Sequence, residues 1–284
     1  MKPRRFIGLI FYGVSGFFLP FVSVCGAPED HPVIAIIIDD MGNQWGGGMK
    51  AINLPGRLTY SFLPFVSYSR SLAGQAVKSG KEVMLHAPMQ SLAGESLGEG
   101  GLTLEMGGDA LKRQFSAQLA AIPNIAGINN HMGSALTQNP ESMAWVMAVI
   151  RQVGESSLFF VDSLTTDFSV AKKMAEDFQV PALSRDVFLD HDESEQAVRN
   201  QFDKLIAIAK QRGYALAIGH PRTNTLKVLG EKLAELDHYG VKLVPVSKLV
   251  DMQARMAETP EPEEVVHAEL SAVDGERLNE FELF

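Results

Sequence analysis

The chain has 284 residues, of which 46% are hydrophobic and 21% are charged, a composition typical of a globular protein with one large core. A formal net charge of -9 argues against nucleic acid as a partner, because phosphate binding requires a basic surface. The single cysteine, Cys25, lies in the N-terminal segment. Downstream of that segment the chain therefore has no thiol for a disulfide, a metal or a catalytic reaction.

The N-terminal segment, residues 1–27, has the pattern of a Sec-type signal peptide. Basic residues precede an apolar run over residues 6–24, and the small residues Gly26 and Ala27 follow it. Glycine, serine and proline interrupt the run, which weakens it as a membrane span. We therefore expect export to the periplasm with cleavage near Ala27, and no stable membrane span after cleavage; retention as an uncleaved anchor stays open.

A strongly apolar stretch follows at residues 33–38, with four isoleucines, and it ends in Asp39 and Asp40. A continuous β-branched run predicts a strand buried on both faces, as in a parallel sheet. Adjacent strand residues point to opposite sides, so the two carboxylates can act together only where the strand already bends into its loop. Gly42 is suited to that bend.

Strands and helices alternate along the rest of the chain, and this alternation predicts a parallel α/β fold. A glycine-rich loop over residues 41–50 leads to a short helix, and the loop over residues 93–108 is long enough to line a site. Asp109 is expected to cap the helix that follows that loop. Further strands are expected at residues 58–65, 82–85, 125–128, 158–161, 182–189, 214–218 and 241–246, and helices at 67–79, 109–121, from 139 onward, and at 170–178, 194–212 and 224–239.

The composition changes near residue 257, where acidic residues and two prolines accumulate. We expect one folded domain over residues 28–256 and a disordered acidic tail over residues 257–284.

Polar residues able to bind a metal or transfer a proton stand at the ends of several predicted strands. The C-terminal ends of strands in a closed parallel sheet meet at one face, where ligands bind. A mixed set of carboxylates and imidazoles is suited to zinc or a similar divalent ion. The candidates are Asp39, Asp40, His86, His131, Asp162 and His220.

These segments together resemble the divergent polysaccharide deacetylases, bacterial envelope proteins related to chitin and peptidoglycan deacetylases. The resemblance covers roughly residues 32–250, and its most specific segment is the one over residues 127–134. It implies an irregular (β/α)7-type barrel, a divalent metal cofactor and an acetylated glycan as substrate. The matching motifs are IDDMG (38–42), LHAPM (85–89), GINNHMGS (127–134), FVDS (160–163) and IGHP (218–221).

The resemblance also implies roles for individual residues. Asp39 corresponds to the general base, Asp40 to a metal ligand and His220 to the general acid. Related enzymes take two metal-binding histidines from one H-x-x-x-H segment, but Gln90 stands four residues after His86.

We therefore expect His86 and His131 to complete the metal site, with Asp162 orienting His220. The Arg-x-Pro-Tyr motif of the related enzymes is absent, so Arg185 becomes a candidate to orient the base. Asn130, Ser134 and Arg185 are expected to contact substrate.

Three functions stay open on the sequence. The first is a metal-dependent hydrolase that removes acetyl groups from an envelope polysaccharide or amino-sugar glycan. The second is an inactive barrel that binds glycan or an envelope protein, and the third is a metal hydrolase of another ester or phosphoester. Oligomeric state has no signal in the sequence.

Overall fold

The structure is a computed structural model that describes residues 31–154 and 157–258. The predicted signal peptide and residues 259–284 of the predicted acidic tail lie outside the described residues. Within the described part, no helix is long and apolar enough to cross a membrane. The strands are β1 Val33–Met41, β2 Thr59–Phe62, β3 Glu82–Met89, β4 Gly127–Met132, β5 Phe159–Asp162, β6 Ala182–Ser184, β7 Val187–Phe188, β8 Tyr214–Gly219 and β9 Lys242–Leu243.

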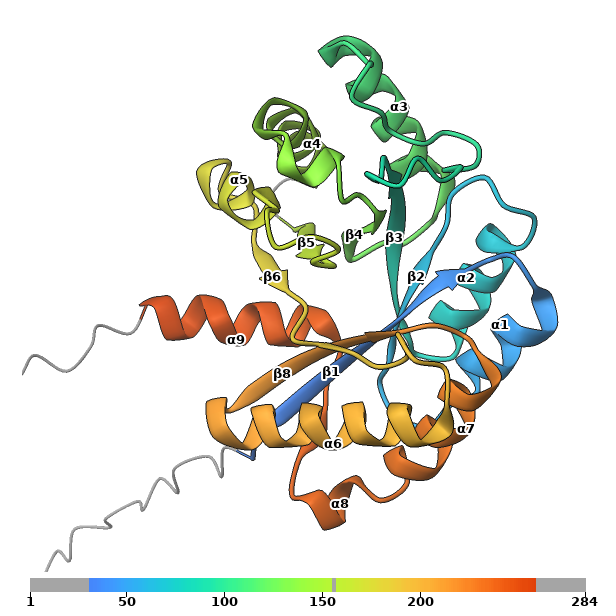
Figure 1. Ribbon diagram of the computed structural model, residues 1–284. Coiled ribbons are helices and arrows are strands. Elements are labelled where there is room, and N and C mark those ends of the chain that lie inside the picture. Colours follow the sequence, from blue (N-terminus) through green and yellow to red (C-terminus); the bar gives the residue numbers. More distant parts are fainter. Residues whose placement is uncertain (1–30, 155–156, 259–284) are drawn as a thin grey trace, which may run out of the picture. The chain divides into compact units, whose positions relative to one another are not determined.

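Helices connect the strands and lie along the sheet (Figure 1). Each amphipathic helix buries its apolar stripe against the strands beside it. The helices are α1 Trp45–Ile52, α2 Ser69–Lys78, α3 Gly108–Ala121, the 3-10 turn η1 Leu136–Gln138, α4 Pro140–Gly154, α5 Ala171–Asp177, α6 Glu195–Arg212, α7 Thr223–Leu233, α8 Leu236–Tyr239 and α9 Val246–Glu258.

The strands form one parallel sheet in the order β6-β5-β4-β3-β2-β1-β8-β7, with β9 beside β1. The two edge strands, β6 and β7, follow each other directly in the chain. The Arg185 amide donates to the carbonyl of Asp162 beside β6, whereas the next amide, that of Asp186, donates to Leu216 on β8. Two consecutive residues thus join the opposite edges of the curled sheet, which confirms the expected irregular (β/α)7-type barrel.

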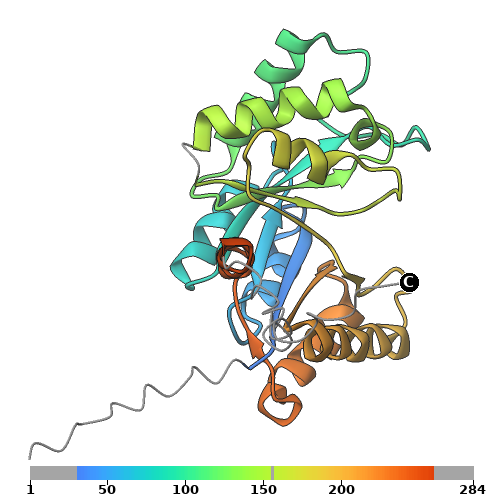
Figure 2. The ribbon, with the colours of Figure 1, turned by 90° about the vertical axis from the view of Figure 1, so that its left-hand side faces the viewer.

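The two faces of the sheet carry separate cores. Ile34, Ile36 and Ile38 of β1 face the helices and belong to the larger cluster of buried apolar residues. Val33, Ala35 and Ile37 alternate with them and face the barrel interior. Val246 and Leu249 of α9 pack into the same interior cluster, so α9 covers the end of the barrel opposite the strand C-termini (Figure 2).

Most predicted elements are confirmed, with five corrections. The helix predicted over residues 224–239 is two helices, α7 and α8. The predicted sixth strand is split into β6 and β7, because its halves pair with different neighbours. Helix α1 begins at Trp45, inside the stretch expected to be a loop. Gly107, not Asp109, is the N-cap of α3, and Asp109 lies in its first turn. Helix α9, which was not predicted, replaces the end of the last predicted strand.

Gly127 tests the packing of the barrel interior beneath the site. A Cβ atom there would overlap the ring of Phe159 on β5. We predict that Gly127→Ala lowers the free energy of unfolding by about 1–3 kcal/mol in urea denaturation. Gly74→Ala is the matched control, because a Cβ at that helical position meets nothing within 4 Å and should raise stability by about 0.5–1 kcal/mol. Equal stabilities for the two variants would contradict this packing.

Candidate functional site

The end of β1 bends so that both of its carboxylates face one site. Asp39 is two residues beyond Ile37 and four beyond Ala35, so its side chain also faces the barrel interior, where it is buried. Asp40 has φ +55°, and the register with β2 shifts between Ile38 and Met41. This left-handed residue interrupts the strand alternation, so the Asp40 carboxylate joins that of Asp39 instead of facing the helices.

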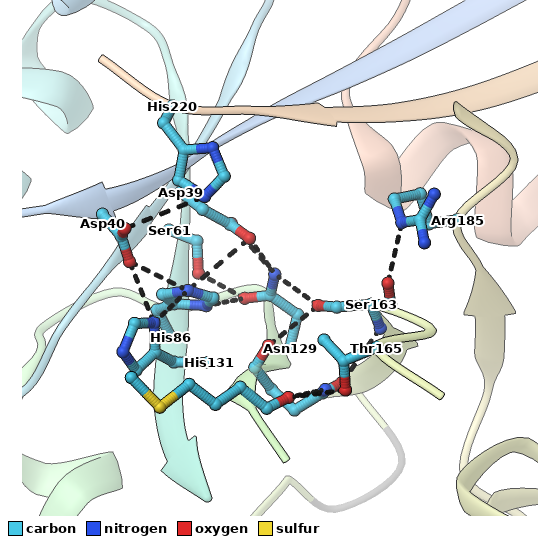
Figure 3. A network of polar contacts seen from close by, with 12 residues as sticks. Asp39, Asp40, Ser61, His86, Asn129, His131, Ser163, Thr165, Arg185 and His220 are labelled. Atoms are coloured by element: carbon cyan, nitrogen blue, oxygen red, sulfur yellow. Dashed lines mark hydrogen bonds and ion pairs between the residues drawn. The ribbon is translucent and has the colours of Figure 1, made fainter. Parts of the chain in front are cut away.

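Three side chains from β1, β3 and β4 converge on one point (Figure 3). Asp40 Oδ1 lies 3.0 Å from His131 Nδ1 and 3.3 Å from His86 Nε2. The two ring nitrogens are 3.2 Å apart. The register of β3 and β4, which pairs His86 with Asn129, brings the two imidazoles together.

This group fits a divalent metal. Asp40 Oδ1 is buried, and no aligned hydrogen bond reaches it from any described residue despite the nearby rings. One carboxylate oxygen and two imidazole nitrogens are donors that zinc accepts, and three protein ligands leave a position open. The structure therefore supports a metal site at Asp40, His86 and His131; the identity of the metal stays a prediction.

The charges of the site are strongly coupled. Burial alone would raise the pKa of Asp40, but the close contacts with the His131 and His86 rings and their charge outweigh it and hold that pKa far below its usual range. Burial raises the pKa of Asp39 despite the neighbouring histidines His86 and His220. Burial opposes protonation of His86, yet the charges of Asp39 and Asp40 raise its pKa.

Asn129 lies at the centre of the buried network. Its Nδ2 donates to both oxygens of Asp39, at 2.9 and 3.0 Å. Its Oδ1 accepts from the Ser61 hydroxyl at 2.5 Å and lies 2.9 Å from His86 Nδ1. The base candidate and a metal-ligand candidate thus contact opposite ends of one amide.

His220 stands on the other side of Asp40, directly after β8. Its Nδ1 lies 2.9 Å from Asp190 Oδ1, and its Nε2 lies 3.7 Å from Asp40 Oδ2. The backbone amide of His220 and the Thr225 hydroxyl both donate to Asp190 Oδ2. Burial opposes the charged imidazole, but hydrogen bonding and charge from Asp190 raise the pKa of His220.

The expected pairing of Asp162 with His220 needs correction. Asp162 follows Phe160 on the helix-facing side of β5, whereas Val161 faces the barrel interior. Its carboxylate accepts from the Leu164 amide and the Ser169 hydroxyl. Asp190 is the carboxylate that orients His220.

Arg185 also differs from expectation. Its guanidinium donates to the carbonyls of Ser163 and Leu164 and stands apart from the carboxylates in Figure 3. Its guanidinium carbon lies 4.9 Å from the centre of the Phe188 ring. Arg185 therefore braces the loop after β5, and Asn129 takes the contact with Asp39 that Arg185 was expected to make.

The other two predicted substrate contacts serve the framework as well. The Asn130 side chain joins the ends of β4 and β5, donating to the Met132 carbonyl and accepting from the Ser163 amide. The Ser134 hydroxyl accepts from the Leu92 amide and so anchors the loop after β3. Asn130 also lines the cavity described below. A substrate contact by either side chain stays a prediction.

The clustered side chains open onto a cavity of about 360 Å³, within the size range of small-molecule sites. A second cavity of about 230 Å³ adjoins it at Asp40, His220 and Arg222. The larger cavity is lined by Asp39, Asp40, His86, Glu95, Asn130, His131, Met132, Ser163, Thr165, Phe188, His191, His220 and Arg222.

Comparison with known proteins places the chain in a family. A family model described as divergent polysaccharide deacetylase matches residues 36–250. The chain belongs to that family. An uncharacterized protein of Haemophilus influenzae is 34% identical over 216 residues, which cover 76% of each chain. The uncharacterized protein YibQ of Escherichia coli is 32% identical over 245 residues, or 86% of this chain and 76% of that one.

A solved structure supports the fold of this family member. The uncharacterized protein ATU2773 of Agrobacterium tumefaciens C58 matches with a TM-score of 0.74 and 23% identity, covering 78% of this chain and 91% of that one. At this identity the likeness concerns the fold alone. The family and the fold together support a polysaccharide deacetylase-like role.

Sequence reasoning missed Ser61, Asn129 and Asp190, which contact the candidate site residues. Strand alternation could have found the first two. Ser61 stands between Tyr60 and Phe62, which face the helices, so Ser61 faces inward. Asn129 is two residues from the candidate ligand His131 and shares its face of the strand. Asp190 gave a weaker signal, since it lies in an acidic loop segment that includes Asp192.

An experiment can distinguish Asp190, which contacts His220 in the structure, from Asp162, which the sequence predicted as its partner. We predict that Asp190→Asn lowers the pKa of the His220 imidazole, because it removes the negative charge that favours protonation. Asp162→Asn is the matched control and leaves that pKa within about 0.3 of the parent, as expected without direct contact. NMR titration of the histidine ring protons measures both values, and a shift in the control alone would contradict the assignment.

Proposed function

We propose that this protein is a metal-dependent hydrolase that removes acetyl groups from an amino sugar of an envelope polysaccharide. The observation that carries the proposal is the convergence of Asp40, His86 and His131 beside a second carboxylate, Asp39, and a histidine held by its own carboxylate. Membership in the divergent polysaccharide deacetylase family supports the reaction class.

The residues divide into holders of the metal and carriers of protons. Asp40, His86 and His131 would hold the ion. Such an ion, when bound, supplies Lewis-acid chemistry that acidifies water and polarises a carbonyl group. Zinc suits the donor set best among the common divalent ions.

Asp39 acts as the general base. Its carboxylate lies 3.6 Å from His86 Nε2, beside the proposed ligands but outside their set. It takes one proton from the attacking water as the oxygen adds to the acetamide carbon. Asn129 holds the carboxylate in place through both oxygens during this transfer.

His220 acts as the general acid. Because its Nδ1 is directed at Asp190, its Nε2 faces the cavity. His220 gives a proton to the amide nitrogen as the carbon–nitrogen bond breaks. Water supplies the hydroxyl group of the released acetate, and the other product is a free amino sugar. Asp39 gains one proton and His220 loses one, so transfer of one proton from Asp39 to His220 restores both residues.

We place the reaction in the periplasm, on the basis of the signal peptide predicted for residues 1–27. An acetylated glycan of the envelope is accessible there. The inactive glycan-binding barrel and the hydrolase of another ester or phosphoester are the alternatives, and product analysis separates them from the proposal.

We predict that the purified chain binds one zinc or similar ion and that His131→Ala loses it, because a ligand nitrogen is removed. His191→Ala is the matched control for metal content, since His191 lines the same cavity outside the ligand set. Elemental analysis after metal loading and dialysis measures the stoichiometry. A parent that stays empty under zinc excess would exclude the metal-dependent hydrolase.

We predict that Asp39→Asn abolishes acetate release from an acetylated amino-sugar oligomer, with a loss of at least about 10²-fold, because it removes the base. The variant keeps its metal, since Asp39 is outside the ligand set. Acetate assays and elemental analysis on the same preparation check both statements. Loss of the metal would mean that the roles of Asp39 and Asp40 are reversed.

A further inference from the structure

The Asn129 amide contacts four partners. Nδ2 faces the Asp39 carboxylate, which can only accept hydrogen bonds when ionised. Nδ2 also reaches the Ser163 hydroxyl at 3.3 Å, and that hydroxyl donates its own proton to the Asn130 carbonyl. The Ser61 hydroxyl donates to Oδ1. A flip of the amide would turn Oδ1 toward the Asp39 carboxylate and lose the bond to the Ser163 hydroxyl, so these two partners fix the orientation.

This orientation determines which ring nitrogen of His86 carries the proton. Because Asn129 Oδ1 can only accept, His86 Nδ1 must carry a proton and donate it across the 2.9 Å contact. In the neutral ring the lone pair then lies on Nε2. That nitrogen is the one that faces Asp40 Oδ1 and His131 Nδ1.

Asn129 is also rigid. Its side chain is completely buried, and His86 stands opposite it in the β3–β4 register. Hydrogen bonds from such outer partners fix the tautomer and ring orientation of metal-binding histidines. Here the same amide also forms hydrogen bonds with the base candidate Asp39, so Asn129 contacts both the proposed metal ligand His86 and the proposed base.

We propose that Asn129 is a positioning residue with two separable tasks. Its Oδ1 holds His86 in the Nδ1-protonated tautomer that presents Nε2 to the metal, and its Nδ2 holds the Asp39 carboxylate in place for proton transfer. The second task rests on the proposed function, whereas the first concerns the metal site and is testable without turnover.

Two variants separate the tasks. Asn129→Ala removes both, so it lowers zinc affinity by about 10–100-fold and reduces acetate release. Asn129→Asp keeps an oxygen for His86 but turns a second carboxylate toward Asp39, which is then repelled or shares a proton with it. Asn129→Asp therefore keeps zinc affinity within about threefold of the parent or tighter, while kcat falls by at least about tenfold.

The experiment begins with nitrogen-15 NMR of the metal-free chain at a pH where His86 is neutral. The proposal predicts protonated Nδ1 in the parent and in Asn129→Asp, and a shift toward protonated Nε2 in Asn129→Ala. Zinc titrations and acetate assays follow on the same three proteins.

Protonated Nε2 in the parent overturns the proposal, even if Asn129→Ala does not fold. Parent-like tautomer and zinc affinity in a folded Asn129→Ala variant overturn the first task. Parent-like kcat in Asn129→Asp overturns the second. A parent that binds no zinc refutes the proposed function, and the NMR result still decides the first task.

Discussion

Asp40 leaves the first strand with φ +55°, a backbone state that costs a non-glycine residue about 1–2 kcal/mol. The turn brings two adjacent carboxylates into one site, which an extended strand forbids. Such strain persists where the surrounding structure fixes it, and it is concentrated at functional sites. The remaining contacts follow from this turn, because Asp40 can then meet His86 and His131 while Asp39 stays with Asn129.

Parallel pairing supplies the partners for this turn. Every strand that contributes to the site has its C-terminal end at the same end of the barrel, so residues far apart in sequence come into contact. Asp39 and Asn129 are 90 positions apart and share two hydrogen bonds. Direct pairing of β8 with β1 places His220 beside Asp40. The two-residue link at Arg185 and Asp186 joins the two edges of the curled sheet.

Much of the fold could be predicted from the sequence, because β1 and several shorter strands are apolar runs that end in polar residues. The split of the sixth strand could not, since residues 182–189 read as one strand and only tertiary pairing assigns its halves to different neighbours. Helix α9 escaped prediction because its role depends on covering the open end of the barrel. Burial there, through Val246 and Leu249, decides the outcome more than local propensity.

The sequence predicted the candidate metal ligands but not the residues that hold the site in place. Asp40, His86 and His131 converge as expected, because their residue types and strand-end positions both indicated a metal. The prediction for Asp162 was wrong, because Asp162 is two residues from Phe160 on β5 and therefore faces the helices. Asn129 shares the inward face of β4 with His131, so strand alternation indicated its direction but not its partners. Asp190 meets His220 from a loop 30 residues away, and no local sequence pattern records that contact.

The central claim is that Asp40, His86 and His131 bind one divalent ion. A crystal structure of the chain with zinc, with anomalous data at the zinc edge, tests it most directly. The account predicts one anomalous peak about 2.0–2.2 Å from Asp40 Oδ1, His86 Nε2 and His131 Nδ1. Zinc excess with no peak at these atoms, or with zinc bound elsewhere in the barrel, would contradict it.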